Sequence, residues 1–282
     1  MDNIQLLNND DAYFAYKALS ASQIKQYDHG AYNFWKTSCF NPDKPEEKET
    51  DALVFGKLTH CLLLEPEEAD SRFVVQDFGK SRKNKEYDKV KSLFPNKCVV
   101  SSAEMERAQK MIAKIREHKL ANLIFDGGKC EVPFVWTDEE TGLECKMKAD
   151  AIKRISGGRL LIVDYKTSSD ISSVLRWPEK LGYPLQEAFY RMGIAKKFDM
   201  PPELVDFVFV LQSNIDGEED VICVAGCDYE TQNTAADIVR QHINAIAERL
   251  NAWNDSRDPD IFAAYPAKET MRYSNWYLQR GE

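Results

Sequence analysis

Two carboxylates and one amine stand close together in the segment KMKADAIKRISGGRLLIVDYKT, as Asp150, Asp164 and Lys166. Residues two apart in a strand point to the same face, so Asp164 and Lys166 are expected to be neighbours. The turn residues SGG predict a hairpin that brings Asp150 alongside them. Charges that follow an apolar run such as LLIV need partners, because unpaired burial is costly. The pattern therefore predicts acids and an amine converging at one end of a sheet.

A divalent metal ion would supply the missing partner for these groups. Carboxylate oxygens suit Mg²⁺ or Mn²⁺, which keep coordination positions open for water and phosphate. Such a metal activates water as a nucleophile and offsets charge on a scissile phosphate. Lys166 would orient that water or stabilise the transition state. The triplet Asp-x-Lys alone is better explained by a salt bridge at a strand end, so the surrounding elements decide between the two interpretations.

The elements that must position these residues change in type along the chain. Helical patterns are expected over 22–35, 51–65, 101–118 and 184–198, and in a long helix that begins at Asp228. Ser20 or Ser22 would cap the first helix, and Ser101 or Ser102 with Glu104 would form a capping box. Strand-like runs are expected over 130–138, 143–155, 159–167, 204–213 and 220–227. The segment 76–97 shows no clear pattern.

This order predicts an α/β fold in which a central mixed sheet is flanked by helices and preceded by a helical region. Residues 1–19 are expected to form a loose arm and residues 259–282 an aromatic tail. A single domain would occupy residues 20–258. Within it, the helical part would cover 20–125 and the sheet core 126–258.

Charge and composition narrow the function classes. The net charge of −9 looks wrong for a nucleic-acid-binding protein, but the charge is segregated. Segment 80–119 holds twelve Lys/Arg against five Asp/Glu, segment 146–197 eleven against five, and segment 198–239 ten acids without Lys or Arg. Nucleic-acid binding needs local positive potential rather than a basic total. The basic runs are also typical of solvated helix faces. For 80–119 alone, a solvated helix face and a nucleic-acid-binding surface explain the charge equally well.

The chain offers no membrane span and no secretory signal, which predicts a cytoplasmic protein without a membrane partner. Its seven cysteines are scattered, and none are spaced as C-x-x-C. An odd count in this setting indicates reduced, mostly buried thiols rather than disulfides or an iron–sulfur cluster.

Several motifs in this order resemble a known nuclease superfamily. The pattern D-x13-D-Y-K across a hairpin resembles the PD-(D/E)XK core, with Asp in place of Glu as the second acid. The helix segment YPLQEAFYR, with Gln186 and Tyr190 spaced as Q-x-x-x-Y, resembles the RecB-like branch. So does FGKLTHCLLLEPE, which carries His60. The segments VVSSAEMERAQKMI to EVPFVWTDEETGLECKMKADAI are similar to phage and prophage RecE-type exonucleases (exodeoxyribonuclease VIII). The resemblance spans Ser20 to Tyr190 and leaves the C-terminal third without a match.

The resemblance implies metal-site roles for individual residues. Asp150 and Asp164 match the metal-binding acids, Lys166 the catalytic lysine, and His60 a further metal ligand. The backbone carbonyl of Tyr165 would lie near the metal. For His60 the alternative is a satisfied core histidine on an apolar helix, which the neighbouring motifs outweigh.

Further positions match the superfamily outside the central motif. Gln186 and Tyr190 match a helix that contacts DNA and supports the site. Lys148, two before Asp150, would share its face and meet phosphate, where relatives often carry Arg. Glu131 matches an acid often found in the first strand, and a simple strand-end charge explains it equally well. The long x13 spacing implies a longer hairpin arm.

The activity implied is a Mg²⁺-dependent (or Mn²⁺-dependent) exonuclease that acts on double-stranded DNA ends. By the same resemblance it would run 5′ to 3′, release 5′-phosphates and leave single-stranded tails for recombination. A ring-shaped homo-oligomer and a single-strand annealing protein as partner are implied too. The alternatives are an endonuclease of the same fold, the CRISPR-associated iron–sulfur type, a non-catalytic DNA-binding module, and an acidic interaction protein. The iron–sulfur type needs a cysteine cluster near the C-terminus, and no cysteine follows Cys227.

Overall fold

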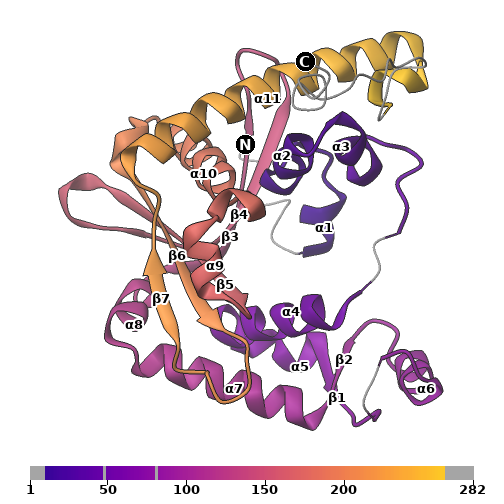
Figure 1. The fold of residues 1–282 in the computed structure, drawn as a ribbon, viewed down its shortest axis with the longest axis vertical. Coiled ribbons are helices and arrows are strands. Elements are labelled where there is room, and N and C mark those ends of the chain that lie inside the picture. The colour runs from indigo at the N-terminus through magenta and orange to yellow at the C-terminus, as the bar shows by residue number, and fades with distance from the viewer. Residues whose placement is uncertain (1–9, 47–48, 80–81, 264–282) are drawn as a thin grey trace, which may run out of the picture.

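Five strands form a mixed sheet in the computed structural model, which describes residues 10–46, 49–79 and 82–263 (Figure 1). In spatial order they are β3 (Lys129–Thr137), β4 (Glu144–Arg154), β5 (Leu160–Ser168), β6 (Val205–Ser213) and β7 (Ile222–Ala225). β3, β4 and β5 pair antiparallel, β5 and β6 pair parallel, and β6 and β7 pair antiparallel. The predicted meander and the mixed sheet are confirmed.

Helices cover both faces of this sheet (Figure 1). One layer consists of α2 (Ala21–Asp28), α3 (Ala31–Thr37), α10 (Tyr183–Phe198) and α11 (Tyr229–Ser256). The other consists of α4 (Asp51–Leu64), α7 (Ser102–Glu117) and α8 (Lys119–Phe125). The smaller elements are α1 (Asp10–Ala15), α5 (Ala69–Arg72), α6 (Lys85–Leu93), α9 (Ile171–Arg176), and the two-stranded sheet of β1 (Phe73–Val75) and β2 (Cys98–Val100). The described part of the chain contains no helix that is both long and apolar enough to cross a membrane.

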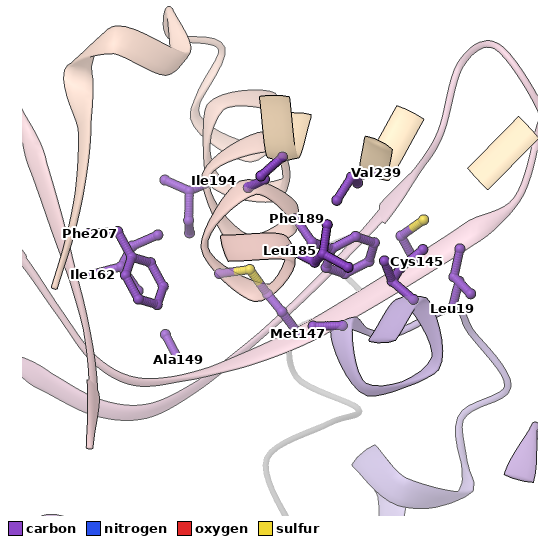
Figure 2. Packing of buried hydrophobic residues seen from close by; sticks show 14 of the residues in the cluster. Leu19, Cys145, Met147, Ala149, Ile162, Leu185, Phe189, Ile194, Phe207 and Val239 are labelled. Atoms are coloured by element: carbon purple, nitrogen blue, oxygen red, sulfur yellow. The ribbon is translucent and has the colours of Figure 1, made fainter. Parts of the chain in front are cut away.

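The alternation of apolar residues along β5 accounts for this layering. Leu160 and Ile162 face the core shared with α10 and α11, whereas Leu161 and Val163 face the core shared with α4 and α8. Figure 2 shows the first core, where strand residues meet one face of α10. Each fully buried aliphatic side chain contributes about 1.5–3 kcal/mol of hydrophobic stabilisation, so both faces of the strand must remain covered.

Local signals set most helix ends as predicted. Ser101 caps α7 and Glu104 completes a capping box. Asp228 caps α11, because its side chain accepts a hydrogen bond from the backbone amide of Thr231 in the first turn. The first helix differs from the prediction. It breaks into α2 and α3 at Gly30, whose φ of 111° lies in a region that L side chains rarely adopt. Helix α6 also forms within 76–97, where Asn84 caps its first turn.

The N-terminal segment is more ordered than the expected loose arm. Residues 10–15 form α1, and Leu19 pairs with Cys145 of β4 through an isolated bridge. Leu19 is fully buried, so hydrophobic contact with the sheet holds the segment in place. Residues 1–9 lie outside the described part of the chain. At the other end, Phe262 of the expected tail packs flat against Trp35, and residues 264–282 lie outside the described part.

Helix α2 is tied to α11 by polar contacts as well as by packing. His242 Nε2 lies 3.0 Å from Asp28 Oδ1, and Arg249 Nε donates to the hydroxyl of Tyr27 over 3.2 Å. The N-terminal helices are therefore fixed to the last helix of the domain.

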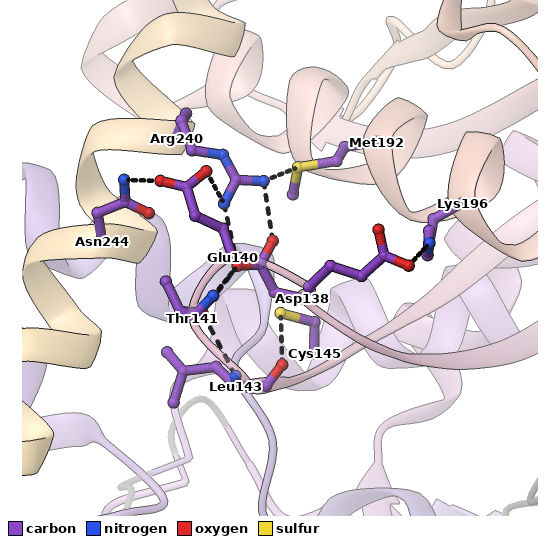
Figure 3. A network of polar contacts seen from close by, with 10 residues as sticks. Asp138, Glu140, Thr141, Leu143, Cys145, Met192, Lys196, Arg240 and Asn244 are labelled. Carbon is purple, nitrogen blue, oxygen red and sulfur yellow. Dashed lines mark hydrogen bonds and ion pairs between the residues drawn. The ribbon is translucent and has the colours of Figure 1, made fainter.

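The turn between β3 and β4 is clamped to α10 and α11 by the network in Figure 3. Asp138, 5% exposed, accepts hydrogen bonds from Arg240 at 2.8 and 3.0 Å and from the Thr141 hydroxyl at 2.7 Å. Burial alone would raise the pKa of Asp138, but the hydrogen bonds from Arg240 and Thr141 outweigh it and lower that pKa. The clamp fixes the hairpin that carries Asp150 toward the candidate site.

We expect Asp138→Asn to reduce the free energy of unfolding by about 2 kcal/mol at neutral pH, because it leaves the Arg240 charge without its counter-charge. The pKa of Asp138 is lower in the folded than in the unfolded chain. Its stabilisation is therefore present above the unfolded value of about 3.9 and lost as pH falls through the folded value. Urea unfolding measures both effects. Glu139→Gln, at an exposed ion pair with Lys196, should change stability by less than about 0.5 kcal/mol. Equal losses in the two variants would contradict the clamp.

Candidate active site

Functional side chains gather where β4 and β5 separate. Pairing between these strands runs from Arg154 to Ala151, which lies opposite Val163. Beyond this point the amide of Tyr165 donates to the Asp150 carboxylate over 2.7 Å instead of to a strand partner. The side chain thus takes over a backbone hydrogen bond, and it holds Asp150 at the open end of the hairpin.

The alternation of β4 slips by one residue at Asp150. Met147 and Ala149 face the α10 core, and Ala151 faces the α4 core although it lies two residues further on. A regular strand would send all three to the same side. The slip therefore occurs at the position of the acid.

The neighbouring strand slips at the same level. Val132 packs against the α10 core and Cys130 against the α4 core. Glu131 lies between them, at the level where the ladder passes from Cys130–Ala151 to Val132–Ala149 without a pair for Glu131 and Asp150. Glu131 has a φ of 51°, in the left-handed region. For a residue other than glycine this costs on the order of 1–3 kcal/mol, and such outliers cluster at functional sites. The strain turns the Glu131 carboxylate toward Asp150.

His60 of α4 completes a group able to hold a metal ion. Ligand atoms of His60, Glu131 and Asp150 all lie within 4.8 Å of one another, and His60 Nδ1 is 3.6 Å from Asp150 Oδ2. Burial and the Lys166 charge lower the pKa of His60 and keep its imidazole neutral, which is the form that binds metals. The imidazole also packs against the ring of Tyr165, with the ring centres 5.2 Å apart, and this contact restricts its orientation.

Asp164 lies beside this group on β5, in contact with Lys166 as the two-residue spacing predicts. Only 1% exposed, it accepts a short hydrogen bond on Oδ1 from Gln186 of α10. Its Oδ2 contacts the Lys166 amine, but no described residue gives this buried oxygen a well-oriented hydrogen bond. A buried carboxylate oxygen left in this state can accept a cation.

Like charges dominate the electrostatics of the site. Burial raises the pKa of Asp150, and the nearby Asp164 carboxylate raises it further. Burial and Asp150 likewise raise the pKa of Glu131, although Lys148 partly offsets them. Burial would lower the pKa of Lys166, yet the two aspartates outweigh it and raise that pKa, so the amine stays charged. Three carboxylates and a neutral imidazole fit Mg²⁺ or Mn²⁺, because a divalent cation would relieve their repulsion.

The remaining predicted residues support these groups through internal contacts. Lys148 forms an ion pair with Glu131, and the Tyr190 hydroxyl donates to the Lys148 carbonyl over 3.2 Å. Gln186 bridges Asp164 and a lysine of α2, Lys25, whose amine lies 3.1 Å from its Oε1. The DNA-contacting role expected for Lys148, Gln186 and Tyr190 stays a prediction.

Two residues at the site escape sequence reasoning. Lys25 lies on an amphipathic helix where a lone lysine gives no distinctive signal. Gln212 of β6 accepts a hydrogen bond from the buried Tyr165 hydroxyl over 2.6 Å and donates to two backbone carbonyls. It therefore holds the Tyr165 side chain, and with it β5, in place. A buried glutamine in an apolar strand is the signal that points to such a role.

Fold and site together define a nuclease-like protein of the PD-(D/E)XK class, in which acids and a lysine meet where the antiparallel strands β4 and β5 separate. The chain belongs to the family described as "PDDEXK-like domain of unknown function (DUF3799)", which matches residues 20–260. No curated protein matches the sequence.

Solved structures support the fold. A crystal structure from Eubacterium rectale, described as a "putative exonuclease", aligns over 100% of both chains with a TM-score of 0.61 and 15% sequence identity. At this identity the likeness concerns the fold alone. A second structure, SSO0001, is 14% identical and covers 67% of this chain and 84% of its own, with a TM-score of 0.29 that carries no argument.

We expect Asp150→Asn to separate metal binding from folding. The neutral amide removes a buried charge from among like charges, so in EDTA the variant should be about 1 kcal/mol more stable than the wild type. The rise in melting temperature that Mn²⁺ gives the wild type should vanish, because one ligand is lost. Thermal unfolding with and without Mn²⁺ measures both. Glu203→Gln, at an exposed acid far from the site, should keep the full rise. A Mn²⁺ response retained by Asp150→Asn would argue against the metal site.

Proposed function

We propose that this protein is a divalent-metal-dependent deoxyribonuclease that hydrolyses phosphodiester bonds. The observation that carries the proposal is the cluster of His60, Glu131 and Asp150, whose ligand atoms all lie within 4.8 Å of one another. The buried Asp164 carboxylate, which repels Asp150, and the charged Lys166 amine lie beside this cluster. Membership of a PDDEXK-like family supports the same chemistry. A salt bridge between Asp164 and Lys166 alone would not call for a strained Glu131 or a neutral, oriented histidine.

Each group has a distinct part in this proposal. His60, Glu131, Asp150 and Asp164 would hold the metal ion, which when bound would supply an activated water and offset charge on the phosphate. Lys166 stays protonated and directs a fixed positive charge at the attacking water or the scissile phosphate. Gln186 holds Oδ1 of Asp164, while Oδ2 contacts the Lys166 amine.

The finer proposal is an exonuclease of the RecE type that runs 5′ to 3′ from double-stranded DNA ends and depends on Mg²⁺. It rests on the motif resemblance and on the description of the Eubacterium rectale neighbour. We propose, by the same resemblance, that it works as a ring-shaped oligomer and hands its single-stranded product to an annealing protein for recombination.

The basic segment 146–197 contributes less surface charge than its composition suggests. Lys146 is buried and donates to two backbone carbonyls, Lys166 lies in the site, and Arg159 pairs with Asp206. Lys196 pairs with Glu139. These cations are engaged in contacts within the fold or the site, so the segment offers fewer free charges to the DNA backbone than its composition suggests.

We expect Asp164→Ala to lower the rate of Mg²⁺-dependent hydrolysis of a labelled duplex by at least about a thousandfold, because it removes a ligand for the ion that supplies the chemistry. Lys166→Ala should retain Mn²⁺ binding and lose about a hundredfold to a thousandfold in rate, since it removes one fixed charge from the transition state. Lys153→Ala, which removes an amine of β4 that contacts backbone carbonyls elsewhere, should stay near wild type. Activity of Lys166→Ala within about twofold of wild type would refute its role.

The exonuclease proposal is tested by offering equimolar linear and relaxed closed-circular DNA in one reaction with Mg²⁺. Contacts to the DNA backbone carry no sequence information, so an exonuclease selects its substrate by the presence of an end. Such an enzyme should degrade the linear molecule progressively and leave the circle intact. Gel analysis over time separates the two substrates. Comparable loss of the circle would make the protein an endonuclease.

A further inference from the structure

A groove with a volume of about 1130 Å³ runs beside the candidate site along the N-terminal helices. Its lining includes Lys166 and Gln186, so it is continuous with the site. The opposite wall comes from α1 and α2, which contribute Phe14, Ser22 and Lys25. Four lysines and one acid line the groove, which gives it positive character: Lys25, Lys44, Lys146, Lys166 and Glu46.

The wall formed by α1 is built into the fold. Lys146 of β4 is 6% exposed, and its amine donates to the carbonyls of Tyr13 and Tyr16 over 2.7 Å each. The same amine lies 4.6 Å from the centre of the Tyr13 ring. The Lys146 amine is thus engaged in contacts that hold α1 against the sheet. Lys146 is therefore part of the groove wall, and the positive charges at the end of the groove next to the site come from Lys25 and Lys166.

Apart from Lys166, Lys25 is the groove lysine that is connected most directly to the site. Its amine donates to Gln186, which in turn donates to Asp164. Its aliphatic chain lies against Gly182, where a Cβ atom would come within 2.5 Å of the lysine carbons. This close packing fixes the path of the side chain. Burial and the neighbouring Lys166 lower the pKa of Lys25 to about 8, so its charge lacks a full counter-charge in the described structure.

Phe14 provides an apolar surface on the same groove. Its side chain is 69% exposed, although the neighbouring Tyr13 ring packs edge-on against it and is itself buried. Burying an aromatic ring is strongly favourable, so a ring left exposed in a basic groove beside a hydrolytic site is suited to stacking on a base.

We infer that this groove binds a single-stranded stretch of nucleic acid, with Lys25 on a backbone phosphate and Phe14 stacked on an unpaired base. The inference deepens the proposed function, since it says how the strand to be cut reaches the site. An aromatic ring on a groove wall stacks most readily on a base that has left the duplex and exposes its face. The strand therefore enters the groove already separated from its complement.

The experiment measures fluorescence anisotropy of a labelled oligothymidylate and of a blunt duplex in EDTA, where hydrolysis is absent. The wild type should bind the single strand, and Lys25→Gln and Phe14→Ala should each weaken that binding about tenfold. Lys25→Gln should also reduce the slope of log affinity against log salt by about one, because one phosphate contact is lost. Lys25→Arg should keep both values, and melting temperatures show whether each variant is folded.

Matched controls lie outside the groove. Lys196→Gln removes the same charge on α10, where the amine pairs with Glu139, and Tyr229→Ala removes a ring that is 78% exposed on α11. Both should bind as the wild type does. Wild-type affinity and salt slope in folded Lys25→Gln and Phe14→Ala, or equal binding losses in the controls, would overturn the inference. Absence of Mg²⁺-dependent hydrolysis by the wild type would instead overturn the proposed function and leave the binding result standing.

Discussion

Repulsion between buried carboxylates is the constraint on which the site depends. Asp150 and Asp164 lie in neighbouring strands at one level of the sheet, and Glu131 is turned toward them by a strained backbone. The Lys166 amine and the imidazole of His60 do not cancel this charge, since the imidazole is neutral. A fold that keeps such groups together has to hold them mechanically. The Asp138–Arg240 clamp, the Tyr165–Asp150 hydrogen bond and the buried Gln212 are the contacts that do so.

The two helical layers meet the sheet with different tasks. The α4 side supplies His60, and the residues of β3 and β4 that follow the slips, Cys130 and Ala151, pack against this side. The α4 layer therefore lies next to the proposed metal. The α10 side supplies Gln186, and through it Lys25 of α2, so it faces the groove. Asp164 is where the two sides join, because one of its oxygens accepts from Gln186 of α10 and the other contacts the Lys166 amine. Substrate delivery and hydrolysis thus converge on a single carboxylate.

The sequence predicts the parts of the site that follow from regular geometry. Period-two spacing places Asp164 next to Lys166, and apolar runs with turn residues predict the mixed sheet. The orientation of Glu131 depends on its own left-handed backbone conformation, which no pattern of residue types predicts. Lys25 and the wall that carries Phe14 depend on how α1 and α2 dock on distant strands, through contacts such as Leu19 with Cys145. Long-range docking of this kind has no local sequence signature, which is why the segment looks like a loose arm.

The tie between α2 and α11 also sets the order in which the protein can mature. Asp28 and His242 are 214 residues apart in the chain, and contacts of such separation form late because a long loop must close first. During synthesis, the carboxylates of β3, β4 and β5 emerge well before the helix to which α2 is tied. The tie that fixes the groove wall to α11 therefore forms only when nearly the whole domain has left the ribosome. A truncated chain would carry the acids without the finished groove that leads a nucleic-acid strand to them.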